Sequence, residues 1–132
     1  VVYARENGQV YLALVHDMFG YWTLSKGHIK PDEELKAGVA REIGEEMSLS
    51  VAVLENLGEN EYISSDPEKG KLRKQVSYFL AEAKNKTDLE LTKSGGLDEA
   101  RWFALNEVAD LKMYDDVVPF VTKALKILAK HD

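Results

Sequence analysis

Three glutamates stand close together in a stretch that has the pattern of a helix. Glu42, Glu45 and Glu46 lie at positions i, i+3 and i+4, a spacing at which like charges repel by about a few tenths of a kcal/mol per pair even in water. On a helical wheel the three acids overlap the edge of the apolar stripe, whereas the acids of an ordinary solvated face lie opposite it. We therefore expect a cation among them.

Binding of a hard divalent metal ion is the chemistry that suits this cluster. Mg²⁺ takes oxygen ligands, usually a few carboxylates, with water and phosphate oxygens completing its coordination. The three histidines are scattered along the chain and cysteine is absent, so the sequence has no ligand set with zinc spacing. The sequence therefore favours Mg²⁺, with Mn²⁺ as a possible replacement.

The acids belong to an amphipathic helix that the sequence predicts from about Asp32 to Met47. Pro31 and Asp32 supply a helix start signal. An apolar side chain then recurs every four residues, which is the spacing of one helical face. These apolar residues are Leu35, Val39, Ile43 and Met47.

The rest of the chain alternates strand and helix signals without repeats. Residues 1–5 and 9–16 are predicted to form an antiparallel hairpin around Asn7-Gly8. Further strands are expected at 51–58, 75–83 and 99–105, a polar loop at 64–74, and a helix at 118–131. The apolar stripe of that helix is Phe120, Val121, Ala124, Leu125 and Leu128. This order predicts an α/β or α+β fold, in which helices pack on a mixed sheet.

Composition limits the classes of protein to which the chain can belong. Its 132 residues suit one domain, 1–132, and a net charge of −6 argues against binding of long nucleic acid, which needs a positive surface. No apolar run approaches the roughly 20 residues of a membrane span. The absence of cysteine fits a reducing compartment. We expect a cytoplasmic protein, monomeric or weakly homodimeric, that acts on a small molecule.

The acidic helix is part of a longer pattern. Gly27, five residues, Glu33, seven residues and then REIGEEMSL (41–49) resemble the Nudix box, G-x5-E-x7-R-E-U-x-E-E-x-G-U with U aliphatic. Eight of the nine specified positions agree, and Ser48 stands where Gly is usual. A box at 27–49 with this many specified acids is far more specific than a short glycine motif. The resemblance implies an α/β/α sandwich and a metal-dependent pyrophosphohydrolase.

The resemblance also implies a role for each box residue. The three clustered glutamates match the metal-binding acids, and the carbonyl oxygen of Lys26 is expected to add a further ligand. Glu33 and Arg41 match a pair that braces the preceding loop against the helix, and Gly27 is the conformationally important residue of the turn. Gly27, Glu33 and Arg41 are therefore structural predictions.

The expected reaction is direct attack of water on a phosphoanhydride. The negative charge of the polyphosphate repels hydroxide, and bound metal would offset that charge and acidify a water. Glu42 or Glu45 could remove the proton. Relatives with a similar box often carry a Glu where this chain has Gly96, and Asp98 or Glu99 could replace it.

The substrate is suggested by the residues around the box. WTLSKGHIKPDE (22–33) is similar to the box of the asymmetric diadenosine tetraphosphate hydrolases, apart from Asp32 in place of Gly. That subgroup forms ATP and AMP. A long polyphosphate needs several cations, although a basic stretch is often only a solvated loop. The candidate cations are Lys26, His28, Lys69, Lys71, Arg73 and Lys74.

An adenine ring is usually held by stacking on aromatic side chains. Tyr62 lies where the subgroup tends to carry a stacking tyrosine, and polar residues follow it. Tyr114 or Phe120 could lie on the opposite side of the ring. Tyr62 is therefore a predicted substrate-binding residue.

Two other functions remain open on the sequence. The same chemistry could act on a nucleoside triphosphate or on the 5′ pyrophosphate of RNA. Alternatively, the domain could bind a nucleotide without cleaving it, because a fold does not determine a function. The departures at Ser48 and Gly96 favour this alternative, and the intact acid cluster opposes it. If the Ser48 position ends the helix in a left-handed turn, serine there costs only about 1 kcal/mol relative to glycine.

Overall fold

The computed structural model describes residues 1–25, 32–91 and 96–130, without the side chains of residues 62, 64, 66 and 73–75. Within these ranges six strands form one mixed sheet in the order β3-β2-β1-β5-β4, with β6 also paired to β2. β1 runs parallel to β5, and the other paired strands are antiparallel. The strands are β1 (Val2–Glu6), β2 (Gln9–Asp17), β3 (Trp22–Thr23), β4 (Val51–Asp66), β5 (Gly70–Ala83) and β6 (Leu97–Ala104).

The predicted N-terminal hairpin is confirmed. β1 and β2 pair antiparallel up to Glu6 opposite Gln9. The two residues of the turn, Asn7 (φ 52°) and Gly8 (φ 81°), both have positive φ. Such a two-residue turn has the twist that joins adjacent antiparallel strands, and Asn-Gly is the sequence that adopts it most easily.

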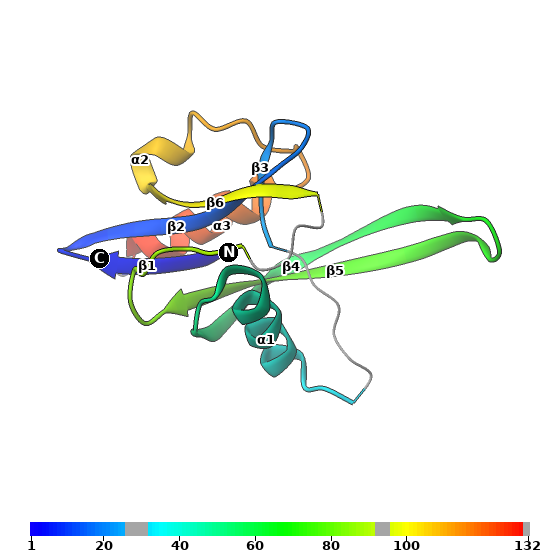
Figure 1. The fold of residues 1–132 in the computed structure, drawn as a ribbon, viewed down its shortest axis with the longest axis horizontal. Coiled ribbons are helices and arrows are strands. Elements are labelled where there is room, and N and C mark those ends of the chain that lie inside the picture. Colours follow the sequence, from blue (N-terminus) through cyan, green and yellow to red (C-terminus); the bar gives the residue numbers. More distant parts are fainter. Residues whose placement is uncertain (26–31, 92–95, 131–132) are drawn as a thin grey trace.

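Helices lie on the two sides of the sheet (Figure 1), so the expected fold class, a mixed sheet flanked by helices, is confirmed. Along β2, Leu12 and Leu14 belong to one buried cluster, while Ala13 and Val15 belong to the other. This alternation follows from the two-residue period of a strand. The helices are α1 (Leu35–Met47) on the second cluster, and α2 (Leu105–Val108) and α3 (Val118–Lys130) on the first.

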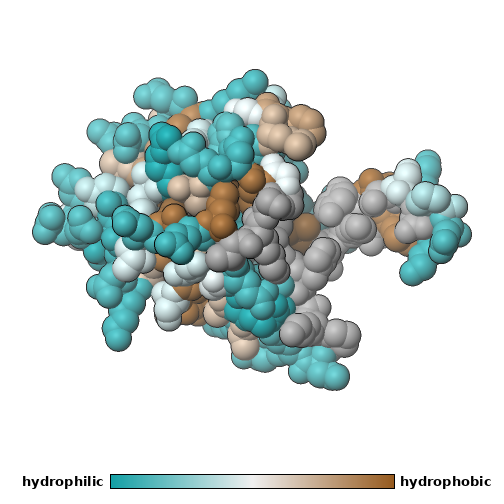
Figure 2. Space-filling view, viewed as in Figure 1, coloured by the Kyte–Doolittle hydropathy of each residue, from teal (hydrophilic) through white to brown (hydrophobic). Residues whose placement is uncertain are grey.

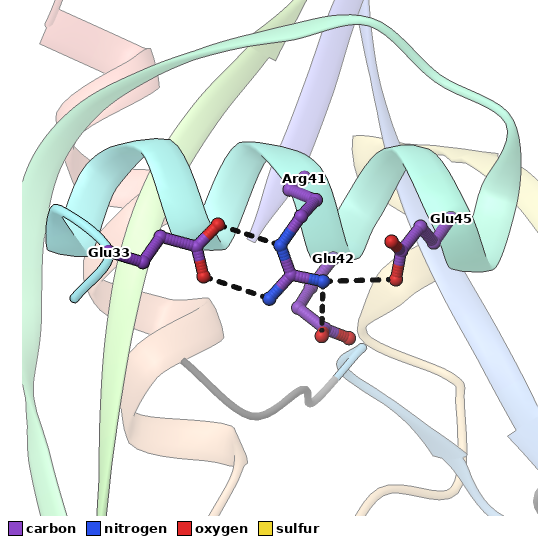
Figure 3. A network of polar contacts seen from close by, with 4 residues as sticks. All are labelled: Glu33, Arg41, Glu42 and Glu45. Carbon is purple, nitrogen blue, oxygen red and sulfur yellow. Dashed lines mark hydrogen bonds and ion pairs between the residues drawn. The ribbon is translucent and has the colours of Figure 1, made fainter. Parts of the chain in front are cut away.

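The two main helices differ slightly from their predicted ranges. The C-terminal helix buries Phe120, Val121, Ala124 and Leu128 as expected. α1, however, begins at Leu35, three residues after the predicted start, and the side chain of Leu35 is 44% exposed. The preceding residues form a turn, from which the Glu33 side chain reaches Arg41 (Figure 3).

The prediction of a polar loop at 64–74 is wrong. β4 continues to Asp66 and β5 begins at Gly70, so that only residues 67–69 form the turn. Gly70 adopts φ 78° there. Backbone hydrogen bonds join the two strands, so an exposed hairpin can form even where its side chains do not alternate between apolar and polar. The β4–β5 hairpin extends well beyond the rest of the molecule (Figure 1).

The length and hydropathy of a helix decide whether it could cross a membrane. None of the helices in the described ranges is both long enough and apolar enough to cross a membrane. The core of the described chain instead consists of the two clusters that α1 and α3 cover.

Candidate functional site

The acidic residues of α1 lie beside its buried face. Ile43 and Met47 are buried in the α1 cluster, and Glu46 is only 5% exposed among them. The Glu42 side chain is 13% exposed and that of Glu45 is 43% exposed. The three acids therefore run from the core to the solvent. A carboxylate as buried as Glu46 is costly to ionise unless hydrogen bonds or a cation compensate it.

A single guanidinium group binds two of these acids together with Glu33 (Figure 3). Arg41 Nε and Nη2 donate to the two carboxylate oxygens of Glu33 at 2.7 and 2.9 Å. Its Nη1 donates to Glu42 at 2.9 Å and to Glu45 at 3.1 Å. The hydrogen bonds to Glu33, followed by those to the other two acids, raise the pKa of Arg41. In this structure Arg41 is a cation among the glutamates, and the proposed bracing role of its pair with Glu33 stays a prediction.

The donor atoms suit a hard divalent ion, but the side chains are turned toward Arg41. In residues 1–25, 32–91 and 96–130, no three acidic, histidine or cysteine side chains are arranged so that they could hold a metal ion. The chemistry of Glu42, Glu45 and Glu46 nevertheless fits Mg²⁺, because all three supply carboxylate oxygens. Metal binding would require Glu42 and Glu45 to turn away from Arg41.

The end of α1 explains the one departure from the box pattern. Ser48 has φ 58° and ψ 36°, which is the left-handed conformation, and its N–H donates to the carbonyl oxygen of Gly44 at 3.0 Å. This is a common way for a helix to end, and glycine adopts it with the least strain. The left-handed end that the sequence reasoning required at this position is therefore present, and the small cost of serine there stays a prediction.

The two acids expected as replacements at Gly96 both have side-chain partners. His16 Nδ1 lies 2.7 Å from Asp98 Oδ1, and Glu99 forms an ion pair with Arg101. Gly96 itself is exposed, with φ 87°. The Asp98 side chain thus contacts a residue of β2, and the Glu99 side chain contacts another residue of β6.

The predicted phosphate-binding residues are placed only in part. Lys26, Gly27 and His28 lie outside the described residues, and so does the side chain of Tyr62. Those of Arg73 and Lys74 are likewise not described. The backbone of Tyr62 pairs with Lys74, and Lys71 is exposed near the tip of the β4–β5 hairpin. Figure 1 shows this tip far from α1, so the structure does not bring Lys71 close to the acid cluster.

The two aromatic candidates for the opposite side of the adenine differ. Phe120 is 8% exposed and stacks on Tyr78 with ring centroids 4.1 Å apart, so it belongs to the core. Tyr114 is half-buried, and its ring stacks on Tyr21 at 4.2 Å.

Sequence reasoning missed the residue that holds Tyr114. Asp17 accepts a hydrogen bond from the Tyr114 hydroxyl and two more from the N–H groups of Phe19 and Tyr21. Desolvation opposes ionisation of Asp17, but these hydrogen bonds together lower its pKa. The bond to Asp17 also raises the pKa of Tyr114 to about 12. The signal was available, because Asp followed three residues later by Gly20 is typical of a turn.

Comparison with known proteins gives both a family and a set of similar folds. The family model described as NUDIX domain matches residues 1–124. A C. elegans Ap4A hydrolase in a binary complex is 24% identical, with a TM-score of 0.71, over 98% of this chain and 94% of that chain. The NUDIX domain of Shewanella oneidensis NrtR complexed with ADP ribose is 20% identical, with a TM-score of 0.69, over 97% and 84%.

A third similar structure comes from a protein with a different substrate. The E. coli dihydroneopterin triphosphate pyrophosphohydrolase is 14% identical, with a TM-score of 0.68, over 96% of this chain and 92% of that chain. At these identities the three structures show a shared fold, and they do not distinguish one substrate from another.

Proposed function

The chain belongs to the NUDIX domain family, and from this premise we propose that it is a metal-dependent pyrophosphohydrolase. Its reaction is the cleavage of a phosphoanhydride bond in a nucleoside polyphosphate by direct attack of water. The preferred substrate in this proposal is diadenosine tetraphosphate, which would be cleaved to ATP and AMP.

The observation that supports the chemistry is the arrangement of acids on α1. One helix carries a buried Glu46, a nearly buried Glu42 and a half-exposed Glu45. Arg41 offsets part of the charge of Glu42 and Glu45 in this structure, but carboxylates at i, i+3 and i+4 still repel one another. Their oxygen atoms form the kind of ligand set that a hard divalent cation prefers.

These residues have separate roles in the proposal. Glu42, Glu45 and Glu46 would hold the divalent ion, which when bound neutralises phosphate oxygens and acidifies a water. Arg41 holds Glu42 and Glu45 through its Nη1 group as long as they are not turned toward the ion. Glu45 is the acid we assign to proton removal, because its side chain is the most exposed of the three. Asp98 and Glu99 already contact His16 and Arg101.

The choice of substrate is supported by the residues around the box and by one similar fold. The stretch WTLSKGHIKPDE resembles the asymmetric diadenosine tetraphosphate hydrolases, and a C. elegans Ap4A hydrolase is among the similar structures. Lys26, His28, Arg73 and Lys74 remain the proposed contacts for the polyphosphate, and Tyr62 the proposed contact for an adenine. Lys71 is left out of this proposal because it lies near the distant hairpin tip.

Product analysis tests this proposal. The protein would be incubated with Mg²⁺ and diadenosine tetraphosphate, dGTP, ADP-ribose or 5′-triphosphorylated RNA, and the products separated by chromatography. Glu46→Gln removes a charge with little change of shape, and Glu55→Gln is the matched control because Glu55 is an exposed residue of β4. We expect ATP plus AMP from wild type and Glu55→Gln, and loss of both products in Glu46→Gln or with EDTA.

The other outcomes are equally informative. Faster cleavage of dGTP, ADP-ribose or RNA would keep the site and replace the substrate. Unchanged turnover in Glu46→Gln would refute the role of the acid cluster. Nucleotide binding without cleavage of any substrate would identify a sensing domain instead of an enzyme.

A further inference from the structure

The turn between β2 and β3 exposes two large apolar side chains. Met18 is 69% exposed and Phe19 is 72% exposed, the two highest values among the large apolar residues of the described chain. Figure 2 shows a tan protrusion at the place where Figure 1 draws this turn. Adjacent exposed apolar residues on a soluble protein commonly mark a binding surface.

Hydrogen bonds hold this turn in one conformation. The Asp17 carboxylate accepts from Phe19 N–H at 3.0 Å and from Tyr21 N–H at 3.1 Å. Asp17 N–H donates to the Tyr21 carbonyl at 2.9 Å, and Met18 N–H donates to the Gly96 carbonyl at 3.0 Å. Phe19 is therefore exposed on an ordered turn, so little ordering of the backbone is needed when a ligand binds.

A second segment of the chain supports the turn from one side. The Tyr114 hydroxyl donates to Asp17, and its ring lies 4.2 Å from that of Tyr21 with an angle of 10° between the planes. Lys112 Nζ lies 4.4 Å from the centroid of the Tyr21 ring. A cation and two stacked rings thus lie beside the turn that carries Phe19. This combination suits a ligand that has both a flat aromatic ring and an anionic group.

The turn also precedes the box closely in the sequence. From Tyr21 to Ser25, the last described residue before the box, the chain can span at most about 14 Å. This short connection is the reason to expect that a molecule bound at the box also reaches Phe19. A nucleotide has the required chemistry, with a flat base at one end and phosphate at the other.

We infer that Met18 and Phe19, held by Asp17, contact a nucleobase of the substrate and contribute to base recognition. This inference takes its ligand from the proposed function, but it can be tested without hydrolysis. Stacking of a base on an aromatic side chain contributes enough that its removal weakens binding by about fivefold or more. Asp17 acts as a positioning residue in this scheme.

AMP and inorganic pyrophosphate are the two probes, because AMP has no phosphoanhydride and pyrophosphate has no base. Their affinities for the full chain would be measured by isothermal titration calorimetry with Mg²⁺, for wild type and for a Met18→Ser/Phe19→Ser variant. Leu54→Ser is the matched control, because Leu54 is 40% exposed on β4 and has no proposed role in substrate binding. We expect at least about fivefold weaker AMP binding with pyrophosphate binding unchanged, and no effect of Leu54→Ser.

Three results would overturn the inference. The first is equal AMP affinity in wild type and the double variant, and the second is no AMP binding by wild type. The third is an equal loss of AMP and pyrophosphate binding, which would indicate a general disturbance of the site. If no substrate is hydrolysed but AMP binding depends on Phe19, the proposed reaction fails and the base contact stands.

Two substitutions of Asp17 test its positioning role. Asp17→Asn keeps an oxygen that can accept from Phe19 and Tyr21 N–H, whereas Asp17→Ala removes it. We expect AMP binding to be close to wild type in Asp17→Asn and weakened in Asp17→Ala, with pyrophosphate binding unchanged in both. Full AMP affinity in Asp17→Ala would contradict the positioning role.

Discussion

Replacing Ser48 by glycine should stabilise the protein, and the conformation at the end of α1 gives the expected size of the effect. Ser48 has φ 58° and ψ 36° and is exposed. A residue with a Cβ atom pays about 1–2 kcal/mol in this left-handed region. Glycine removes that strain but makes the unfolded chain more flexible, which costs about 0.4–1 kcal/mol.

The net gain is therefore about 0.5–1 kcal/mol. For a chain of 132 residues this corresponds to a rise in Tm of about 2–4 °C, because the entropy of unfolding scales with chain length. Urea denaturation followed by circular dichroism would measure the free energy of unfolding, and calorimetry the Tm. Hydrolysis should change little, because the N–H of residue 48 can still donate to the Gly44 carbonyl.

Ser50→Gly is the matched control. Ser50 is also exposed, but it is not among the described non-glycine residues with positive φ. Glycine there relieves no strain and should destabilise the fold by about 0.4–1 kcal/mol. Changes of the same sign in both variants would refute the conformational explanation. A large gain in turnover in Ser48→Gly would instead show that this residue affects the catalytic site.

A pair of glycine substitutions tests the fold, and a substitution of Asp17 tests the turn between β2 and β3. Gly58→Ala should destabilise the protein by roughly 2–4 kcal/mol in urea denaturation, because Gly58 has φ 132° and an added Cβ would lie 2.9 Å from Phe120. Gly70→Ala should cost only about 1 kcal/mol, since its φ is 78° and no atom lies within 4 Å of an added Cβ; equal costs would contradict this reasoning. The hydrogen bonds that lower the pKa of Asp17 stabilise the fold above the ordinary pKa of aspartate, and this contribution is lost as pH falls through the lowered value. The stability advantage of wild type over Asp17→Asn should therefore shrink on acidification, and an advantage independent of pH would refute the assignment.

Several features of the fold and site follow from neighbouring residues and were predicted correctly. Asn7-Gly8 determines the first hairpin because few other pairs adopt its turn without strain. The spacing of Glu46 relative to Ile43 and Met47 places all three on the buried side of α1, because 3.6 residues per turn relate them directly. The box pattern has glycine at the position of Ser48, and glycine after a helix is typical of the left-handed end that the structure shows there. Each of these features depends on residues within a few positions of one another.

Other features were decided by pairing over long distances in the sequence. The β4–β5 hairpin is longer than its apolar stretches because backbone hydrogen bonds hold the ladder, whatever side chains the strands carry. The contact between Asp17 and Tyr114 joins residues 97 positions apart, and it forms because β3 brings Trp22 N–H to the Lys112 carbonyl. Likewise, Phe120 is a core residue because the folded chain places its ring against Tyr78 of β5 and next to Gly58 of β4. The local sequence determines which element forms and which side chains share a face, whereas only the folded chain determines which distant groups meet.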